Sequence, residues 1–234
     1  MAKTKKEEKS SGVDLLENPD ALASRAEEFF NSKKNQNLLF VVLGVAILIV
    51  GGLTFFRFQQ GNKNAEAQRE MFQAIYYFEQ DSLGRGLNGD GNNYGFLDII
   101  NRYSGTKAAN LASFYAGASY LKLGQWENAI RSLEDFSSDD YLLQARAYSL
   151  IGDAYMELDD FDKAIGAYND AAGYKPNKEF TPVYLQKLAI ALEESGDVTA
   201  AAAAYDRILN DFAKSRMEQE ALKHSARLKG LAVE

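Results

Sequence analysis

Hydrophobic and polar residues follow two different patterns along the chain. Residues 38–56 read LLFVVLGVAILIVGGLTFF, without a charged side chain, and the charge-free window extends from Lys34 to Arg57. From residue 65 onward, apolar residues recur at spacings of three and four, which is typical of helices that bury one face. The sequence therefore predicts an all-α fold in which one wholly apolar helix precedes a series of amphipathic helices.

The apolar run has the length of a membrane span. Its nineteen residues would rise roughly 28 Å as a helix, close to the ~30 Å hydrocarbon core of a bilayer. A helix that is apolar on every side offers no face to water, and no other part of the chain is apolar enough to surround it in a soluble core. We therefore expect a transmembrane helix over residues 38–56, with anchoring side chains that include Leu38, Phe40, Val45, Leu48, Phe55 and Phe56.

A cleaved signal peptide explains this run less well. The run is longer than the ~7–15 residues of a signal h-region, it follows a tail of residues 1–37, and no small-x-small cleavage site comes after it. The chain has no cysteine, which excludes lipoprotein processing. We expect an uncleaved anchor that separates the tail from a domain beyond the span.

The distribution of Lys and Arg around the span predicts its orientation, because basic residues resist translocation. Within fifteen residues of the span the two flanks carry three basic residues each, so only the clustering beside the membrane edge and the whole tail favour an N-terminus inside. This predicts a single-pass inner-membrane protein with residues 57–234 in the periplasm of a Gram-negative cell. The tail carries Lys3, Lys5, Lys6, Lys9, Arg25, Lys33 and Lys34, and the far flank carries Arg57, Lys63 and Arg69.

Charge and residue types exclude several classes of function. The formal net charge is −7, and the tail is neutral, so the domain beyond it is acidic and unsuited to nucleic acid. With no cysteine and a single histidine, His224, the usual zinc and iron sites cannot be built. No nucleophile elbow, phosphate loop or dinucleotide fingerprint is present. We expect a protein without a catalytic site, a metal or a cofactor.

The tail contains one segment with a helical signature. Asn18 and Pro19 form a helix start, with Asn as N-cap and Pro as first helical residue. The apolar residues that follow fall on one side of such a helix. Two readings stay open, a short interfacial or partner-binding helix and a weakly ordered lead-in to the span. These apolar residues are Leu22, Ala26, Phe29 and Phe30.

Residues 57–109 are predicted to form a stalk and a degenerate first helical hairpin. Residues 65–80 have a helical apolar face, which continues from the span unless Gly61 breaks the helix. The glycine-rich stretch LGRGLNGDGNNYG, residues 83–95, is predicted to be a turn between two helices. The apolar face comprises Met71, Ile75 and Phe78 before this turn and Phe96, Ile99, Ile100 and Tyr103 after it.

The same glycine-rich stretch has some features of a calcium loop. Asn88, Asp90 and Asn92 occupy alternate positions, as the ligands of such a loop do. The EF-hand pattern requires glycine where Asn93 stands and glutamate where Ile99 stands. Because both are missing, we interpret the stretch as a turn and not as a metal site.

From residue 110 the chain repeats itself with a period near 34. A glycine or alanine, an aromatic residue three positions later and an alanine nine positions after that recur, a pattern that resembles the tetratricopeptide repeat. Three copies, residues 110–143, 145–178 and 182–214, are followed by a polar capping helix over residues 215–229. The matching residues are Gly117, Tyr120 and Ala129 in the first copy, Gly152, Tyr155 and Ala164 in the second, and Ala189 and Ala201, followed by Tyr205, in the third.

These residue types have a physical role in a repeat. Small residues at the eighth and twentieth positions let the two helices of a hairpin approach closely, and a hairpin cannot bury its apolar face without a neighbour. The copies should therefore stack into an α-solenoid. The acidic pairs 139–140 and 159–160 fall at predicted helix starts, where they would stabilise the N-termini. Trp126, which opens the second helix of the first copy, is predicted to be structural.

A stacked helical array presents a concave surface from the first helix of each repeat. In tetratricopeptide domains the second, fifth, ninth, twelfth and thirteenth positions face this surface, and the Lys and Asn set that clamps a C-terminal carboxylate is missing here. Alternatively, the apolar residues of the first copy are covered by the preceding hairpin. The predicted groove residues are Leu111, Phe114, Leu121, Lys122, Arg146, Ser149, Asp153, Met156, Glu157, Gln186, Ile190 and Glu193.

A short tail, one span and a tetratricopeptide-like domain together resemble the YfgM family of inner-membrane proteins, and the NGDGN loop resembles its Bacteroidota-type members. The resemblance implies association with the SecYEG translocon and a PpiD-like chaperone, in the handling of secreted proteins. Two other roles stay open: a scaffold for another envelope complex, such as outer-membrane assembly or cell division, and a cytosol-facing adaptor with the opposite topology.

Overall fold

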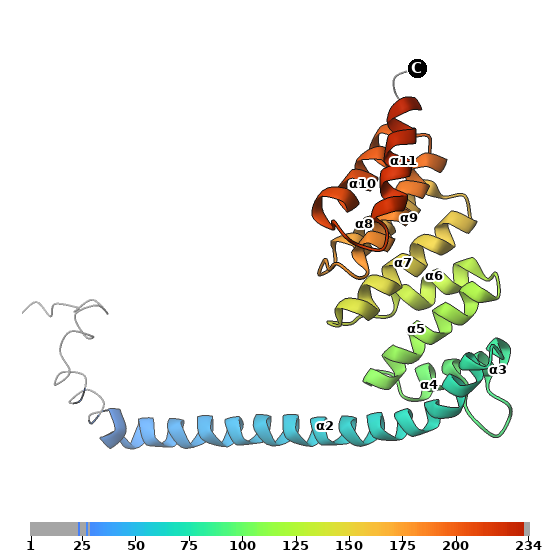
Figure 1. The fold of residues 1–234 in the computed structure, drawn as a ribbon. Helices are drawn as coiled ribbons and strands as arrows, with labels where there is room; N and C mark the ends of the chain where they lie inside the picture. Colours follow the sequence, from blue (N-terminus) through green and yellow to red (C-terminus); the bar gives the residue numbers. More distant parts are fainter. Residues whose placement is uncertain (1–22, 24–26, 28, 232–234) are drawn as a thin grey trace, which may run out of the picture. The chain divides into compact units, whose positions relative to one another are not determined.

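The computed structural model describes residues 23, 27 and 29–231, and every regular element among them is a helix (Figure 1). The predicted all-α class is confirmed. The chain divides into two compact units, Met1–Gln59 and Gln60–Glu234. Of the predicted tail helix, Leu22 and Ala26 lie outside the described residues, whereas Phe29 and Phe30 are helical and exposed.

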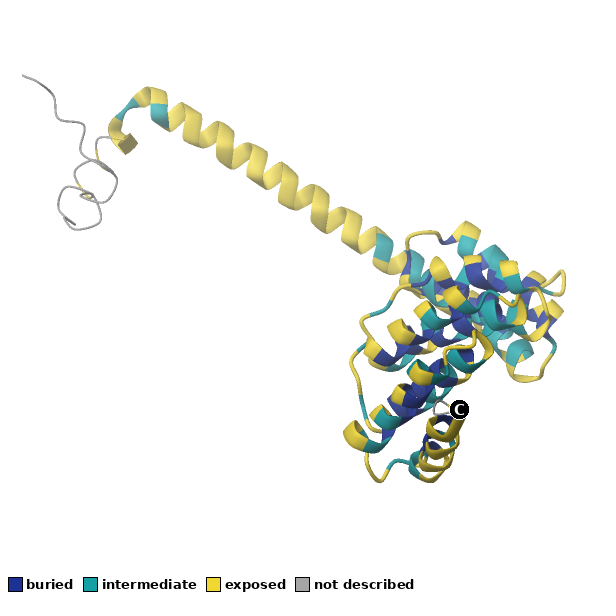
Figure 2. Cartoon of the chain, turned by 90° about the horizontal axis from the view of Figure 1, so that it is seen from above, coloured by how far each residue is buried: buried dark blue, intermediate teal, exposed yellow. Residues whose placement is uncertain are grey.

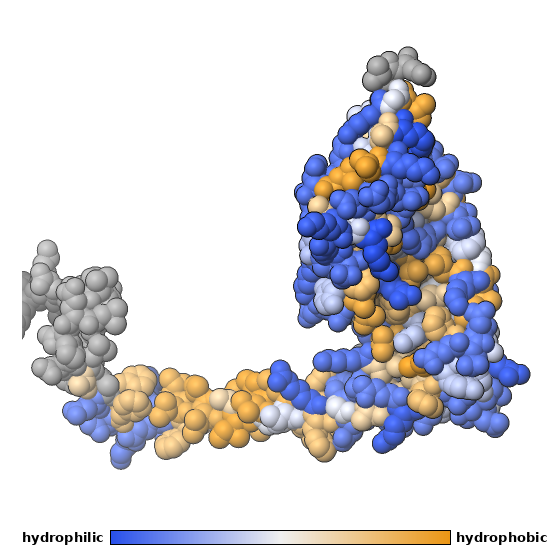
Figure 3. All heavy atoms as spheres, in the orientation of Figure 1, coloured by the Kyte–Doolittle hydropathy of each residue, from blue (hydrophilic) through white to orange (hydrophobic). Residues whose placement is uncertain are grey.

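The apolar run lies in the first part of helix α2 (Lys33–Glu79). All side chains from residue 36 to residue 59 are exposed, including the six predicted anchor residues. Figure 2 shows this part of the helix as exposed, and the face seen in Figure 3 is largely hydrophobic. The Thr54 hydroxyl donates to the carbonyl oxygens of Val50 and Gly51, both at 2.9 Å, so the helix itself satisfies this polar group. Among the described residues, α2 is the one helix long and apolar enough to cross a membrane.

The second unit begins with the C-terminal part of α2. The helix continues without a break at Gly61. Ala67, Met71 and Ala74 are buried against α4 (Phe96–Arg102) and α5 (Lys107–Lys122). Asn64 supports this packing, because its side-chain oxygen accepts a hydrogen bond from the backbone N–H of Ala108 at 2.9 Å.

The glycine-rich stretch is not a simple turn. Its first six residues form helix α3 (Leu83–Asn88), because Leu83 and Leu87 bury an apolar face. A loop follows, in which the Asp90 carboxylate accepts hydrogen bonds from the Asn92 and Asn93 N–H groups and from the Tyr77 hydroxyl at 2.6 Å. The tyrosine bond, reinforced by the bonds from Asn93, holds the pKa of Asp90 well below its usual range.

Gly95 lets this loop close against the end of α3. A Cβ at Gly95 would lie 2.2 Å from the Leu87 carbonyl oxygen, so no other residue fits there without moving the backbone. The Asp90 carboxylate is thus already hydrogen-bonded, to the backbone of its own loop and to Tyr77. The described residues hold no cluster of side chains that could bind a metal ion.

Over the described residues from 107 to 231, seven helices form the rest of the unit, and each packs against the next in the chain (Figure 1). The helices pair as hairpins, one for each predicted repeat, and the last helix covers the end. Four of the six hairpin helices carry a side-chain N-cap, among them Asp140 and Asp160, as the sequence predicted. The helices after α5 are α6 (Trp126–Glu134), α7 (Tyr141–Glu157), α8 (Phe161–Gly173), α9 (Thr181–Glu194), α10 (Val198–Asp211) and α11 (Glu218–Leu231).

Close approach at the eighth position of each repeat holds the hairpins together. A Cβ added at Gly117 would lie 2.5 Å from Cγ of Leu133, and one added at Gly152 would lie 2.5 Å from Cε1 of Tyr168. Ala189, at the same position of the third repeat, is completely buried. The partner helix therefore fills the space where a larger side chain would stand.

Helix α11 closes the stack through contacts with α10. Asp206 accepts hydrogen bonds from the Lys229 ammonium at 2.8 Å and from the buried Ser225 hydroxyl at 2.6 Å, and these two bonds lower the pKa of its carboxyl. The His224 ring stacks on Tyr205, with centroids 5.2 Å apart. The one histidine of the chain is therefore a packed residue of the cap. Burial raises the pKa of Tyr205 to about 12.

Two glycine-to-alanine substitutions on adjacent helices test the close approach. Gly152→Ala should destabilise the protein by about 1–3 kcal/mol, because the methyl group overlaps the buried Tyr168 ring. Gly166→Ala should stabilise it by about 0.5–1 kcal/mol, because no atom lies within 4 Å and alanine favours the helix. Thermal unfolding followed by far-UV circular dichroism measures both. Equal shifts in the melting temperature of the two variants would contradict the close helix approach at Gly152.

Candidate functional site

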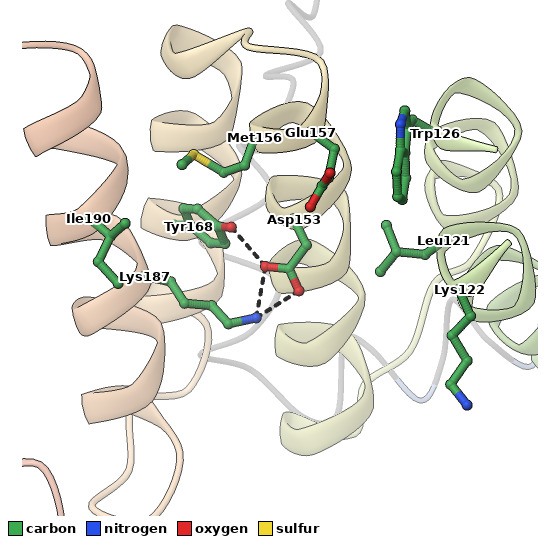
Figure 4. A pocket seen from close by; sticks show the side chains of 9 residues that line it. All are labelled: Leu121, Lys122, Trp126, Asp153, Met156, Glu157, Tyr168, Lys187 and Ile190. Carbon is green, nitrogen blue, oxygen red and sulfur yellow. Dashed lines mark hydrogen bonds and ion pairs between the residues drawn. The ribbon is translucent and has the colours of Figure 1, made fainter. Parts of the chain in front are cut away.

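A partly apolar groove of the second unit lies at the ends of the first helices of the repeats. It encloses about 480 Å³ and is lined from α5, α6, α7, α8 and α9 (Figure 4). Leu121, Met156 and Ile190 supply aliphatic surface, and Trp126 supplies an aromatic ring. The remaining lining residues are Lys122, Asp153, Glu157, Tyr168 and Lys187.

Repeat geometry explains why these residues meet. Asp153, Met156 and Glu157 share one face of α7, at spacings of three and four, near the end of that helix. Gly124, which has a φ of +72°, makes the turn between α5 and α6. The Trp126 ring lies against this turn, 3.6 Å from where a Cβ of Gly124 would be. The turn therefore directs the indole toward the groove.

A hydrogen-bonded polar network crosses the floor of the groove. The Lys187 ammonium donates to both carboxylate oxygens of Asp153 at 2.7 Å and to the Ser149 hydroxyl at 3.1 Å. The Tyr168 hydroxyl donates to Asp153 at 2.7 Å (Figure 4). Burial, reinforced by the Asp153 charge, raises the pKa of Tyr168 above its usual range, so this phenol stays a donor. The network joins α7, α8 and α9 and fixes the groove before any partner arrives.

The second lysine of the groove is also paired. The Lys122 ammonium lies 2.7 Å from the Asp81 carboxylate and 5.5 Å from the centroid of the Phe78 ring. Asp81 belongs to the turn after α2, so this ion pair connects the first repeat with the helices that precede it. No lysine that lines the groove is left without a carboxylate.

Six of the twelve predicted groove residues line the observed groove, namely Leu121, Lys122, Asp153, Met156, Glu157 and Ile190. Among the other six, Arg146 is exposed and Gln186 half-buried, and neither lines the groove. Glu193 pairs with Arg227 of α11. Ser149 is buried and contributes only its hydroxyl to the floor.

The two remaining predicted residues belong to the core. Phe114 is 7% exposed and packs on Phe136, with ring centroids 5.2 Å apart, so the placement of Phe114 in the groove is wrong. Its cover comes from α6 and α7, which follow it, and not from the preceding hairpin. Leu111 is half-buried between this cluster and the one formed with the end of α2.

Three residues that line the groove were not among those predicted from the sequence. Lys187 follows a predicted groove position, but its long side chain turns back to α7 to reach Asp153. The Tyr168 ring is buried in the core, while its hydroxyl reaches the groove floor. Trp126 was predicted to be structural, yet it is half-buried and lines the groove. Trp126 is the single tryptophan of the chain, and this was the sequence signal that could have suggested a role in binding.

Comparison with known families identifies the repeats. Two family models, both described as tetratricopeptide repeat, match residues 116–179 and residues 184–215. The chain therefore carries tetratricopeptide repeats over these residues. Such repeats form a protein–protein interaction module, and their fold is typically a non-catalytic scaffold. A search of curated proteins gave no match.

Two solved structures share the fold. The MamA RS-1 ArsTM double mutant is 22% identical, with a TM-score of 0.51, and the match covers 73% of this chain and 91% of that one. A Podospora anserina kinesin light chain with nearly identical tetratricopeptide-like repeats is 12% identical, with a TM-score of 0.51, and the match covers 72% of this chain and 97% of that one. At these identities the likeness shows the fold alone.

The network on the groove floor should contribute more stability than an ion pair at the surface. Lys187 and Asp153 have side chains that are 34% and 29% exposed, whereas those of Lys163 and Asp160 are 61% and 33% exposed. A double-mutant cycle with Lys187→Met and Asp153→Asn should give a coupling energy of about 1 kcal/mol, already reduced for solvent screening. The matched cycle with Lys163→Met and Asp160→Asn should give a smaller coupling energy, because solvent screens this exposed pair. Equal coupling energies would show that the groove-floor pair contributes no more stability than the surface pair.

Proposed function

We propose that this protein is a membrane-anchored interaction module that binds other proteins through the groove of its repeats. The observation that carries the proposal is a preformed, half-apolar groove on a stack of tetratricopeptide hairpins. Its floor is fixed by Lys187 and Asp153, and its walls expose Trp126, Met156 and Ile190 to a partner. Rigid exposed surface of this kind lowers the entropic cost of binding.

The proposed anchor is the apolar part of α2, residues 38–56. Its length, its exposed apolar side chains and its internally satisfied Thr54 hydroxyl all suit lipid. We further propose that the tail stays in the cytoplasm and that the repeats lie in the periplasm. The support for this orientation is the cluster of basic residues before the span.

The proposed partners are the SecYEG translocon and a PpiD-like periplasmic chaperone. This assignment rests on the resemblance to the YfgM family, in which a short tail and one span likewise precede a repeat domain. In this role the span would keep the repeats near the exit of the translocon. The groove would then meet chaperones or newly secreted chains.

Topology can be measured with a single cysteine, since the parent chain has none. Gln219, an exposed residue of α11, is replaced by cysteine and labelled in cells with a permeabilised outer membrane by an impermeant maleimide. We expect labelling at this site, whereas a Ser10→Cys control in the tail should be labelled only after lysis. The reverse pattern would place the repeats in the cytosol and overturn the translocon proposal.

Photocrosslinking tests the partner. Benzoyl-phenylalanine at Met156 lies in the groove, and the same group at Asn169 occupies an exposed position of α8 outside it. We expect adducts with translocon or chaperone subunits from Met156 and not from Asn169. Adducts with subunits of outer-membrane assembly or cell division would favour the envelope-scaffold alternative. Identical adducts from both positions would contradict a role for the groove.

A further inference from the structure

The charges in the groove are unevenly balanced. Lys187 is held by Asp153 and Lys122 by Asp81, so both cations that line the groove have a carboxylate partner. Glu157, at the end of α7, also lines the groove, is exposed, and forms no ion pair with any described residue. The groove therefore carries one uncompensated negative charge.

This carboxylate shares the groove with an aromatic ring. The Glu157 and Trp126 side chains both point into the space between α7 and the α5–α6 hairpin (Figure 4). An indole face attracts cations through its quadrupole, and a carboxylate attracts them through its charge. A Lys or Arg side chain placed between the two would gain both interactions. Its aliphatic stem would meanwhile cover apolar surface.

The rest of the groove suits an apolar neighbour of that cation. Leu121 lies beside Trp126, and Met156 and Ile190 line the opposite part of the groove (Figure 4). Ile190 is 43% exposed although it is a large aliphatic residue, so a bound side chain would remove apolar surface from water. Methionine adapts its shape to different apolar side chains.

We propose that the groove selects peptide segments in which a Lys or Arg residue stands next to a bulky aliphatic residue. The basic side chain lies between Trp126 and Glu157, and the aliphatic side chain lies against Met156 and Ile190. This inference rests on the proposed function only in that the groove must bind segments of other proteins. It names the chemistry of the segment, which the presence of repeats does not.

Acidic segments are the opposite case. An acidic side chain or a C-terminal carboxylate needs a cation that is free to pair with it. Lys187 would first have to leave two carboxylate oxygens at 2.7 Å, and Lys122 would have to leave Asp81 at the same distance. Such a ligand would also bring its charge near Glu157. Discrimination therefore arises from repulsion as well as from attraction.

The single tryptophan of the chain makes the test specific to this site. Trp126 lines the groove, so its fluorescence reports occupancy there and not binding elsewhere. The full chain, in a detergent without aromatic groups, is titrated with the tryptophan-free peptide acetyl-Gly-Ser-Leu-Arg-Leu-Ser-Gly-amide. Matched peptides carry citrulline, which is neutral and nearly isosteric, or Glu in place of Arg. Titration of empty micelles corrects for partitioning.

We expect the Arg peptide to shift the Trp126 emission and to bind about fivefold more tightly than the citrulline peptide. The Glu peptide should bind most weakly, and added salt should reduce the preference for Arg. Glu157→Gln should make the Arg and citrulline peptides bind about equally. The matched control Asp162→Asn, at an exposed carboxylate of α8 outside the groove, should keep the preference.

Three results among peptides that do bind would overturn the inference. They are equal binding of the Arg and citrulline peptides to the parent chain, tighter binding of the Glu peptide, and a preference for Arg that survives Glu157→Gln. If no peptide shifts the Trp126 emission, the groove is not a site for these segments and the inference also fails. The proposed function is judged separately, by the adducts formed from Met156, so its failure is distinguishable from that of the peptide chemistry.

Discussion

Close approach of the two helices within each repeat is the constraint on which the second unit depends. Where Gly117 and Gly152 face their partner helices, the neighbouring Leu133 and Tyr168 side chains already occupy the space of a Cβ. Helices that approach this closely bury one face between them but leave another face for the next hairpin. Stacking is therefore required for stability, and α11 is needed to end the stack.

The groove is a consequence of the same stacking. Successive first helices place their final turns beside one another, so Leu121, Met156 and Ile190 meet although they are far apart in the sequence. Lys187 then connects α9 to α7 through Asp153, and Tyr168 reaches this carboxylate from within its own hairpin. Because these bonds satisfy the polar groups of the floor, binding energy can come from the walls and from Glu157.

The two parts of α2 differ in how their apolar side chains are distributed around the helix. In the apolar part of α2 every side chain from residue 36 to residue 59 is exposed, so its composition suits lipid and not a protein core. From Ala67 onward the same helix has one buried face, which packs on α4 and α5. The change from apolar on all sides to apolar on one side marks where the helix takes up a folded environment.

The sequence by itself determined the all-α class, the apolar helix, the repeat period and the acidic helix starts at Asp140 and Asp160, because each depends on residues close together in the chain. Three residues that it assigned to the groove, Asp153, Met156 and Glu157, line the groove of the structure, since their positions follow from the helical period within one repeat. Only the tertiary structure decided that Phe114 is covered by α6 and α7, that Leu83 and Leu87 give the glycine-rich stretch a helix, and that Lys187 turns back to Asp153. These outcomes depend on which surfaces meet across helices, and the spacing of residues within one helix does not determine that.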